Sequence, residues 1–226
     1  MPPSLMPPSL TPLQARVLVA LSPLSPPAVL TGGGALAGVH LGHRTTRDLD
    51  LFLRDRAELR DAPADAARRL RDAGLSVDVI RDAPAFVQLD VADHGEHVVV
   101  DLVADPVPNI EPPSLHRIEG VEIAVDGLHD IFVNKLCTLL SRSELRDLID
   151  VHALIGAGAD LGRAAADAPR KDAGFSPITL AWVLERYPLG KLAAALGHDR
   201  ETVAELDAFR RDLSVQLLDL VRPELA

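Results

Sequence analysis

Two aspartates, Asp48 and Asp50, are separated by one leucine at the start of the apolar run 51–53. Side chains two positions apart in a β-strand point to the same face, so a strand here would place both carboxylates side by side. Adjacent carboxylates repel each other unless a cation lies between them, and Mg²⁺ prefers carboxylate and phosphate oxygens. The pair predicts a metal site at a strand start, although an isolated Asp-x-Asp is more often a solvated strand end.

Three consecutive glycines, Gly32, Gly33 and Gly34, lie between the apolar segment 28–30 and a short apolar helical segment. Glycine adopts positive φ readily, so backbone N–H groups here can turn inward around an anion, and the following helix adds its positive end. A glycine run alone is more often a tight turn. Its position shortly before the aspartate pair favours a site that handles a nucleoside triphosphate.

A third acid, Asp101, lies within the otherwise apolar run 98–103. A carboxylate in such a strand is seldom buried without a partner, so Asp101 either faces solvent or joins a site. Beside Asp48 and Asp50 it would complete a metal cluster and act on the attacking hydroxyl. Asp90 and Asp105 are alternatives for this third position.

A basic and acidic cluster is expected where two helices meet. The apolar helix 128–140 carries one cation, Lys135, and Arg142 and Asp147 follow within the next turns. These charges could be ordinary surface groups. A junction of helix, loop and helix is also a suitable place to meet the phosphates of a triphosphate.

The second of these helices has the sequence ELRDLIDVHALI. Ser141 and Glu144 have the spacing of a capping box at its start. Asp147 and Asp150 would share one face, and Arg146 would pair with Asp150 at i,i+4.

The remaining pattern alternates helices and strands after a proline-rich tail, 1–10, which is expected to be disordered. A helix capped by Thr11, with Pro12 at its first position, is expected to run to Leu21. Further helices are predicted at 57–73, 180–187, 189–196 and 202–221, strands at 49–53, 75–80, 85–91, 97–103 and 121–125, a hairpin turn at 93–96 and a proline-rich loop at 104–120.

Composition sets outer limits on the class of protein. The 226 residues are 47% hydrophobic and 25% charged, as in a globular protein of one large or two small domains. The formal charge of −10 is concentrated in residues 61–130, so no strong electrostatic footprint for nucleic acid is visible. The single cysteine, Cys137, allows no internal disulfide and is expected to be buried and reduced. Neither a signal peptide nor a membrane span is expected, and a cytoplasmic location is predicted.

Three blocks, GGGALAGVHLGHRTTRDLDLFL, VVVDLV and DIFVNKLCTLLSRSELRDLIDVHALI, occur in this order between about residues 28 and 156. In this order they resemble the AbiEii toxin family of nucleotidyltransferases, within the DNA polymerase beta superfamily. The resemblance implies an α+β fold: a nucleotidyltransferase-like mixed β-sheet flanked by helices, with a helical C-terminal part. The expected division is a tail at 1–10, an α/β core at 11–127 and a helical part at 128–226 that completes the cleft.

The resemblance also implies roles for individual residues. Asp48, Asp50 and Asp101 would be the catalytic acids that hold Mg²⁺, with two ions expected; the triphosphate would contact Gly32, Gly33, Gly34 and Arg142; and Lys135 and Asp147 would complete the family's fourth motif. Gly34 departs from the pattern, because the family usually has a hydroxyl residue after two glycines. The implied partners are a nucleoside triphosphate, a tRNA or other acceptor, and a cognate antitoxin protein.

Three alternatives stay open at this stage. A small-molecule nucleotidyltransferase would use the same acids, and the acidic middle of the chain suits a cationic acceptor such as an aminoglycoside. A non-catalytic descendant would bind only nucleotide or a partner. A phosphatase is disfavoured, because its Asp-x-Asp pair follows a buried strand whereas this strand begins at the pair.

Overall fold

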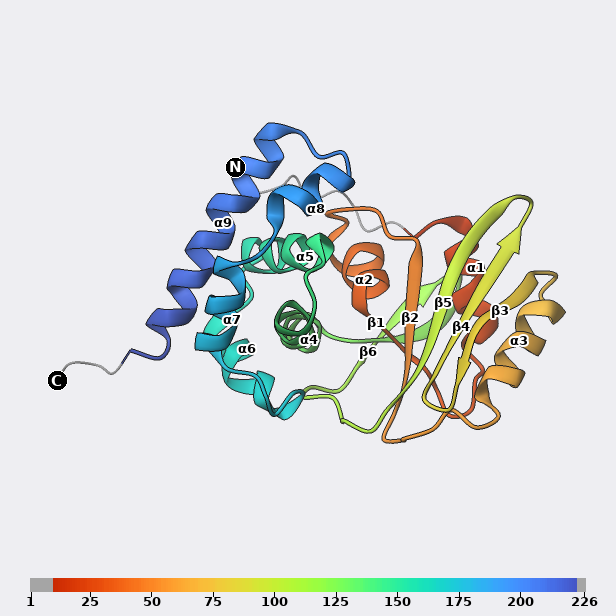
Figure 1. Cartoon of the computed structure of the whole chain (residues 1–226). Helices are drawn as coiled ribbons and strands as arrows, with labels where there is room; N and C mark the ends of the chain where they lie inside the picture. Colours follow the sequence, from red (N-terminus) through yellow and green to blue (C-terminus); the bar gives the residue numbers. More distant parts are fainter. Residues whose placement is uncertain (1–9, 223–226) are drawn as a thin grey trace. The chain divides into compact units, whose positions relative to one another are not determined.

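The computed structural model describes residues 10–222 and divides into two compact units, one up to Ile131 and one from Phe132 (Figure 1). The first unit is built on a seven-stranded mixed sheet, and the second contains helices only within the described range. The proline-rich tail predicted for 1–10 lies, apart from Leu10, outside the described residues. No helix within residues 10–222 is long and apolar enough to cross a membrane.

The strands of the sheet run in the order β3-β4-β5-β2-β1-β7-β6. β2 pairs with β5 and β1 with β7 in parallel, and the other neighbouring pairs are antiparallel. The bounds are β1 Val29–Thr31, β2 Asp48–Arg54, β3 Ser76–Ala83, β4 Phe86–Asp93, β5 Glu96–Asp105, β6 Ser114–Ile118 and β7 Val121–Val125.

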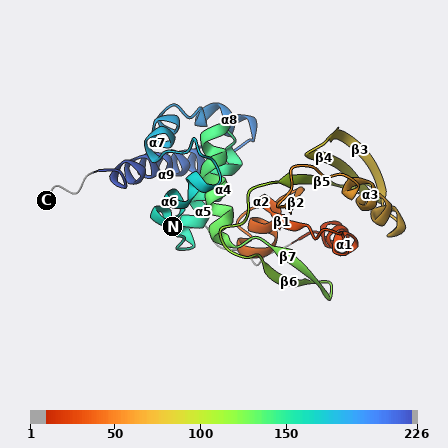
Figure 2. The same cartoon turned by 90° about the horizontal axis from the view of Figure 1, so that it is seen from below.

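Helices α1 (Pro12–Leu21) and α3 (Ala62–Asp72) lie side by side on one face of this sheet (Figures 1 and 2). Thr11 caps α1 as predicted: its hydroxyl accepts from the Gln14 N–H, and the Gln14 side chain accepts from the Thr11 N–H. Alternate residues of β2, β4 and β5 are buried, and the residues between them form a half-exposed second face. That face is available for polar side chains.

The glycine run begins a helix rather than a loop. Helix α2 (Gly32–Ala35) continues as a π-helix, η1 (Leu36–Leu41), which ends at Gly42 in the left-handed conformation. Helix α2 packs against β1 and β2. The short apolar helical segment expected after the glycines is therefore confirmed.

The second unit consists of α4 (Leu128–Ser141), whose first turn precedes the division, α5 (Leu145–Gly156), α6 (Leu161–Asp167), the short 3₁₀ helix η2 (Ala168–Arg170), α7 (Pro177–Glu185), α8 (Leu189–Ala195) and α9 (Arg200–Asp219). The longest, α9, packs along α7, with the Ser214 hydroxyl donating to the Ala181 carbonyl over 3.4 Å. The Cys137 thiol is half-buried and directed at the Ala168 carbonyl, and burial raises its pKa to about 11.

Several predicted elements need correction. The loop expected at 104–120 contains β6, an edge strand that pairs with β7. The strand was missed because it is short and directly follows two prolines. The helix expected from residue 57 starts only at Ala62, with a proline in its first turn. Ser141 does not cap α5: it ends α4, and its hydroxyl donates to the Thr138 carbonyl. Glu144 occupies the cap position of α5, but its side chain makes no capping hydrogen bond. Helix α5 therefore begins at a position that has no hydroxyl side chain to cap it.

Candidate active site

The aspartate pair lies at the start of β2, on the half-exposed face of the sheet. Asp48 and Asp50 are half-buried, whereas Leu49 between them and Leu51 after them are buried. This alternation is the period of two that a strand imposes. The prediction that both carboxylates project from one face is therefore confirmed.

Asp101 projects from the neighbouring strand at the same level. In the parallel pairing of β2 with β5, Asp101 lies opposite Asp50. Gln88 lies opposite Asp101 on the other side, and its amide Nε2 donates to Asp101 Oδ1 over 2.8 Å. Burial raises the pKa of Asp101, the Gln88 hydrogen bond opposes that rise, and the charge of Asp48 adds to it. The sheet thus brings the three predicted acids together on adjacent strands.

The two alternative third acids have other partners. Asp105 forms an ion pair with Arg54 at the far end of β2, and Arg54 also reaches the buried Asp126 over 2.6 Å. Asp90 accepts from His97 Nδ1 over 3.0 Å. Register and partners therefore favour Asp101 over both.

Gly32 adopts a φ of +59°, and a Cβ at this position would overlap the carboxylate of Asp50. Only glycine allows both the left-handed backbone and this close approach. A Cβ at Gly33 would lie 2.8 Å from Arg44 Nη2, the far end of a flexible side chain. The backbone turn is therefore pressed directly against one of the predicted metal ligands.

Gly34 has a different environment from the other two glycines. A Cβ there would lie 3.1 Å from Leu30 Cδ1 and 3.2 Å from Leu49 Cδ2, so a larger residue would push against buried leucines. A hydroxyl residue, which the family pattern has here, would need these leucine side chains to shift. The role of Gly34 in binding a triphosphate stays a prediction.

A second group of predicted residues lies in the helical unit. Lys135 Nζ bonds Asp147 Oδ1 over 2.8 Å and Asp150 Oδ2 over 2.7 Å. The side chains are 9%, 1% and 0% exposed, so this is a buried triad of one cation and two anions. Burial alone would lower the pKa of Lys135, but the two carboxylates outweigh it and raise the pKa. The predicted common face of Asp147 and Asp150 is confirmed.

Arg142 binds the same cluster from its exposed side. Its Nε donates to Asp147 Oδ2 over 2.9 Å, and its Nη1 lies 3.4 Å from Glu144 Oε1. Half of the Arg142 side chain is exposed, whereas Lys135 is enclosed. Arg146 has Glu144 as a partner at 3.3 Å, and Asp150 has Lys135. The Arg146–Asp150 pairing stays a prediction.

Tyr187 is a residue that the sequence did not single out. Its hydroxyl is buried without a hydrogen-bond partner among the described residues. Burial raises the pKa of this phenol, and the charges of Asp147 and Glu144 raise it further. A tyrosine between two helices gives no sequence signal of such a position.

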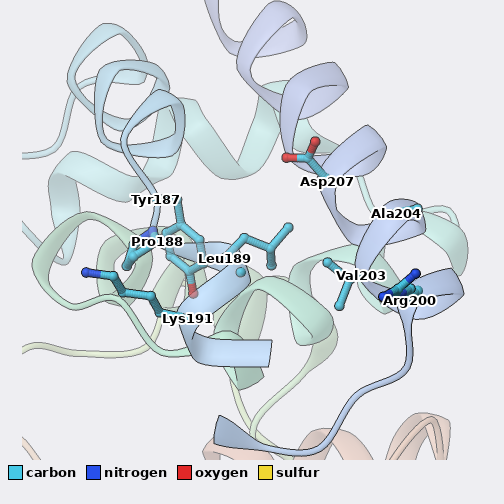
Figure 3. A pocket seen from close by; sticks show the side chains of 9 residues that line it. Tyr187, Pro188, Leu189, Lys191, Arg200, Val203, Ala204 and Asp207 are labelled. Atoms are coloured by element: carbon cyan, nitrogen blue, oxygen red, sulfur yellow. The ribbon is translucent and has the colours of Figure 1, made fainter. Parts of the chain in front are cut away.

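Tyr187 also lines a shallow pocket of about 490 Å³ between the α7–α8 turn and α9. Figure 3 shows Lys191 on one side of this pocket and Arg200 on the other, with Asp207 on α9. Arg210 and Arg211 both pair with Asp207. A substrate-docking role is conceivable from sequence for the basic residues Arg186, Lys191, Arg210 and Arg211 of this helical segment, and of these four only Lys191 lines the pocket.

The predicted site residues thus form two groups, each within its own unit. Asp48, Asp50 and Asp101 with the glycine turn lie on the sheet unit, and Lys135, Arg142 and Asp147 lie on the helical unit. Within residues 10–222, no group of three or more His, Cys, Asp or Glu side chains is gathered closely enough to hold a metal ion. The backbone register aligns the acids, and a shared cation would require their side chains to turn toward each other.

The chain is similar to known structures over most of its length. The match to JHP933 from Helicobacter pylori covers 92% of this chain and 91% of that chain, with 19% sequence identity and a TM-score of 0.55. It is 18% identical to MenT4, a nucleotidyltransferase toxin from Mycobacterium tuberculosis, over 91% of this chain and 82% of that chain, with a TM-score of 0.53. For an antigenic nucleotidyltransferase-like protein from Paracoccidioides brasiliensis, the identity is 15%, the coverage 86% and 96%, and the TM-score 0.52. These likenesses confirm the α+β nucleotidyltransferase-like fold.

Comparison of the sequence identifies the family as well as the fold. No sequence among the curated proteins matches the chain. The sequence profile described as "Nucleotidyl transferase AbiEii toxin, Type IV TA system" matches residues 16–217, most of the chain. The chain therefore belongs to the AbiEii family of nucleotidyltransferase toxins of type IV toxin–antitoxin systems.

Proposed function

We propose that this nucleotidyltransferase uses Mg²⁺ to move a nucleoside monophosphate from a nucleoside triphosphate to tRNA, as the cytoplasmic toxin of a pair with a cognate antitoxin. The observation that carries the proposal is the register of Asp50 with Asp101 on β2 and β5, with Asp48 on the same face. A glycine turn packed against Asp50 is the second support. The family description supports the toxin role.

The donor set suits a hard divalent cation. Asp48, Asp50 and Asp101 supply only carboxylate oxygens, the ligands that Mg²⁺ takes together with phosphates. Burial and the charge of Asp48 raise the pKa of Asp101, and a cation bound between the two carboxylates would lower it again. When bound, such an ion would neutralise phosphate charge and ease deprotonation of the acceptor hydroxyl.

The transfer itself is a substitution at the α-phosphorus. The acceptor hydroxyl oxygen forms a bond to that phosphorus, the bond to the bridging oxygen breaks, and pyrophosphate leaves. Asp101, the acid with the raised pKa, is the group proposed to take the hydroxyl proton. The backbone N–H groups from Gly32 onward would hold phosphate oxygens beside Asp50.

In the helical unit the two cations differ in how far they are buried and paired. The charge of Lys135 is already balanced inside the protein by Asp147 and Asp150. Arg142 keeps half of its side chain in solvent. We therefore propose Arg142 as the phosphate-binding cation, with Lys135 and Asp147 holding it in place.

A second acceptor class has one observation in its favour. Asp78 lies opposite Asp90 on neighbouring strands. Val99 lies between Asp90 and Asp48 in the same row. A row that contains three carboxylates therefore crosses this face of the sheet. A cationic small molecule such as an aminoglycoside would be attracted to this row. Transfer to such a molecule is the alternative to transfer to tRNA.

The experiment that separates these acceptors uses each of the four labelled nucleoside triphosphates with Mg²⁺ and either total bacterial tRNA or a panel of aminoglycosides. Label that migrates with tRNA on a denaturing gel would support the proposal and identify the nucleotide. Label on an aminoglycoside alone would replace tRNA with the second acceptor. Absence of pyrophosphate release under all conditions would overturn the proposed function.

A further inference from the structure

Arg81 and Phe86 form a pair on the half-exposed face of the sheet, beside the predicted third acid. The guanidinium carbon of Arg81 lies 5.3 Å from the centre of the Phe86 ring. Arg81 comes from the edge strand β3 and Phe86 from the start of β4. Aromatic residues make up only 3% of the chain, so a half-exposed phenylalanine at this place is a distinct surface feature.

Strand register connects this pair to the acids. Arg81 lies opposite Gln88, Gln88 lies opposite Asp101, and Asp101 lies opposite Asp50. Residues directly opposite each other in paired strands share a face. A single row therefore runs from the edge of the sheet to the predicted metal ligands.

Phe86 belongs to the next row. It lies opposite Val103, which in turn lies opposite Phe52 on β2. Phe52 also has a cation over its ring, at 4.8 Å, but that cation is Arg54, which two carboxylates hold in place. The two aromatic–cation pairs thus differ in whether the cation is already engaged.

Arg81 has no carboxylate partner among residues 10–222, although it lies in the most acidic third of the chain. Asp78 and Asp90 lie opposite each other on neighbouring positions of the same strands. Asp90 is bonded to His97 instead. The Arg81 guanidinium is therefore exposed, charged and available to a ligand.

We propose that Arg81 and Phe86, called here the Arg81–Phe86 platform, bind the terminal nucleotide of an RNA acceptor and deliver its hydroxyl to Asp101. This inference rests on the proposed function. The Phe86 ring would stack on the base, and the Arg81 guanidinium would contact the adjacent phosphate. Gln88, between the platform and Asp101, would keep the carboxylate oriented through its 2.8 Å hydrogen bond.

The chemistry of the pair favours RNA over a cationic acceptor or a protein. A cation at the outer end of the row would repel an aminoglycoside, whereas it attracts a phosphate. A half-exposed aromatic ring suits a base, whichever base it is. The neighbouring row of carboxylates, Asp78, Asp90 and Asp48, would repel RNA phosphates and so confine the RNA to the row that begins at Arg81.

The test compares variants of the platform with a matched control. Phe86→Leu removes the flat ring but keeps an apolar side chain, Phe86→Tyr keeps the ring, and Arg81→Gln removes the charge. Arg68→Gln removes an exposed arginine from α3, which packs on the opposite face of the sheet. Thermal melting of each variant establishes that it is folded.

The measurement is KM and kcat for labelled nucleotide transfer, with total tRNA and the nucleoside triphosphate varied in turn. Loss of one stacked base corresponds to about a 5- to 150-fold change in affinity. We expect Phe86→Leu and Arg81→Gln to raise the KM for tRNA by a factor in this range, with the KM for the triphosphate within twofold of wild type. Phe86→Tyr, which keeps the ring, should raise the KM for tRNA less than Phe86→Leu does, and Arg68→Gln should match the wild type.

Two outcomes would overturn the platform, and they are distinguishable. If the wild type labels tRNA and Phe86→Leu leaves the KM for tRNA unchanged, the platform is wrong while the proposed function stands. If the wild type labels an aminoglycoside or a protein and no RNA, both are wrong.

Discussion

Removing Lys135 should cost more stability than removing any exposed cation of the chain. Lys135→Met takes the cation from between Asp147 and Asp150, whose side chains are 1% and 0% exposed, and from bonds of 2.8 and 2.7 Å. Removing one partner of a buried ion pair typically costs about 3–5 kcal/mol, because the remaining charge has lost its compensation. We expect a loss in that range in the free energy of unfolding.

The assay is urea-induced unfolding followed by far-UV circular dichroism. Arg142→Met is the matched control, because Arg142 contacts the same Asp147 but is half-exposed; its loss should cost about 1 kcal/mol or less. The double variant Lys135→Met with Asp150→Leu should recover part of the loss, since apolar replacement of a buried pair is often nearly neutral. A Lys135→Met variant as stable as Arg142→Met would show that the buried triad contributes no more stability than the half-exposed Arg142–Asp147 pair.

Two further predictions concern the sheet. Gly32→Ala should reduce transfer at least tenfold and destabilise the protein by about 1–3 kcal/mol, because the backbone has a φ of +59° and the added Cβ would meet the Asp50 carboxylate. Gly74→Ala is the control, because Gly74 has a φ of +79° but no neighbour within 4 Å. It should have a comparable backbone cost and keep full activity in the same labelling assay. Gln88→Leu removes the hydrogen bond that lowers the pKa of Asp101 against burial, so that pKa should rise further. The acidic limb of the pH–rate profile should therefore move to higher pH, and an unshifted limb would show that ionised Asp101 is not needed.

The strand bearing the acids was predictable because its signals are local. Alternation of aspartate and leucine at 48–53 fixes which side chains share a face, and the structure has β2 at Asp48–Arg54. Thr11 and Pro12 likewise define the start of α1 within four residues of sequence.

Features that depend on contacts between distant segments were not predictable. The hydrogen bond from Gln88 to Asp101 requires the register of β4 on β5. The enclosure of Lys135 depends on α5 folding against α4, and it changes the role inferred for that lysine. β6 was missed because an edge strand of five residues after a proline-rich stretch has little pattern of its own.

The role of Asp50 as a catalytic metal ligand is tested by nucleotide transfer by Asp50→Asn beside the wild type, with labelled nucleoside triphosphates, Mg²⁺ and tRNA. The substitution keeps the shape of the side chain that faces Gly32 and removes only the charge that a metal ion needs. We expect transfer to fall below detection while the melting temperature stays within a few degrees of wild type. Full transfer by a folded Asp50→Asn protein would contradict the assignment of this carboxylate to the catalytic centre.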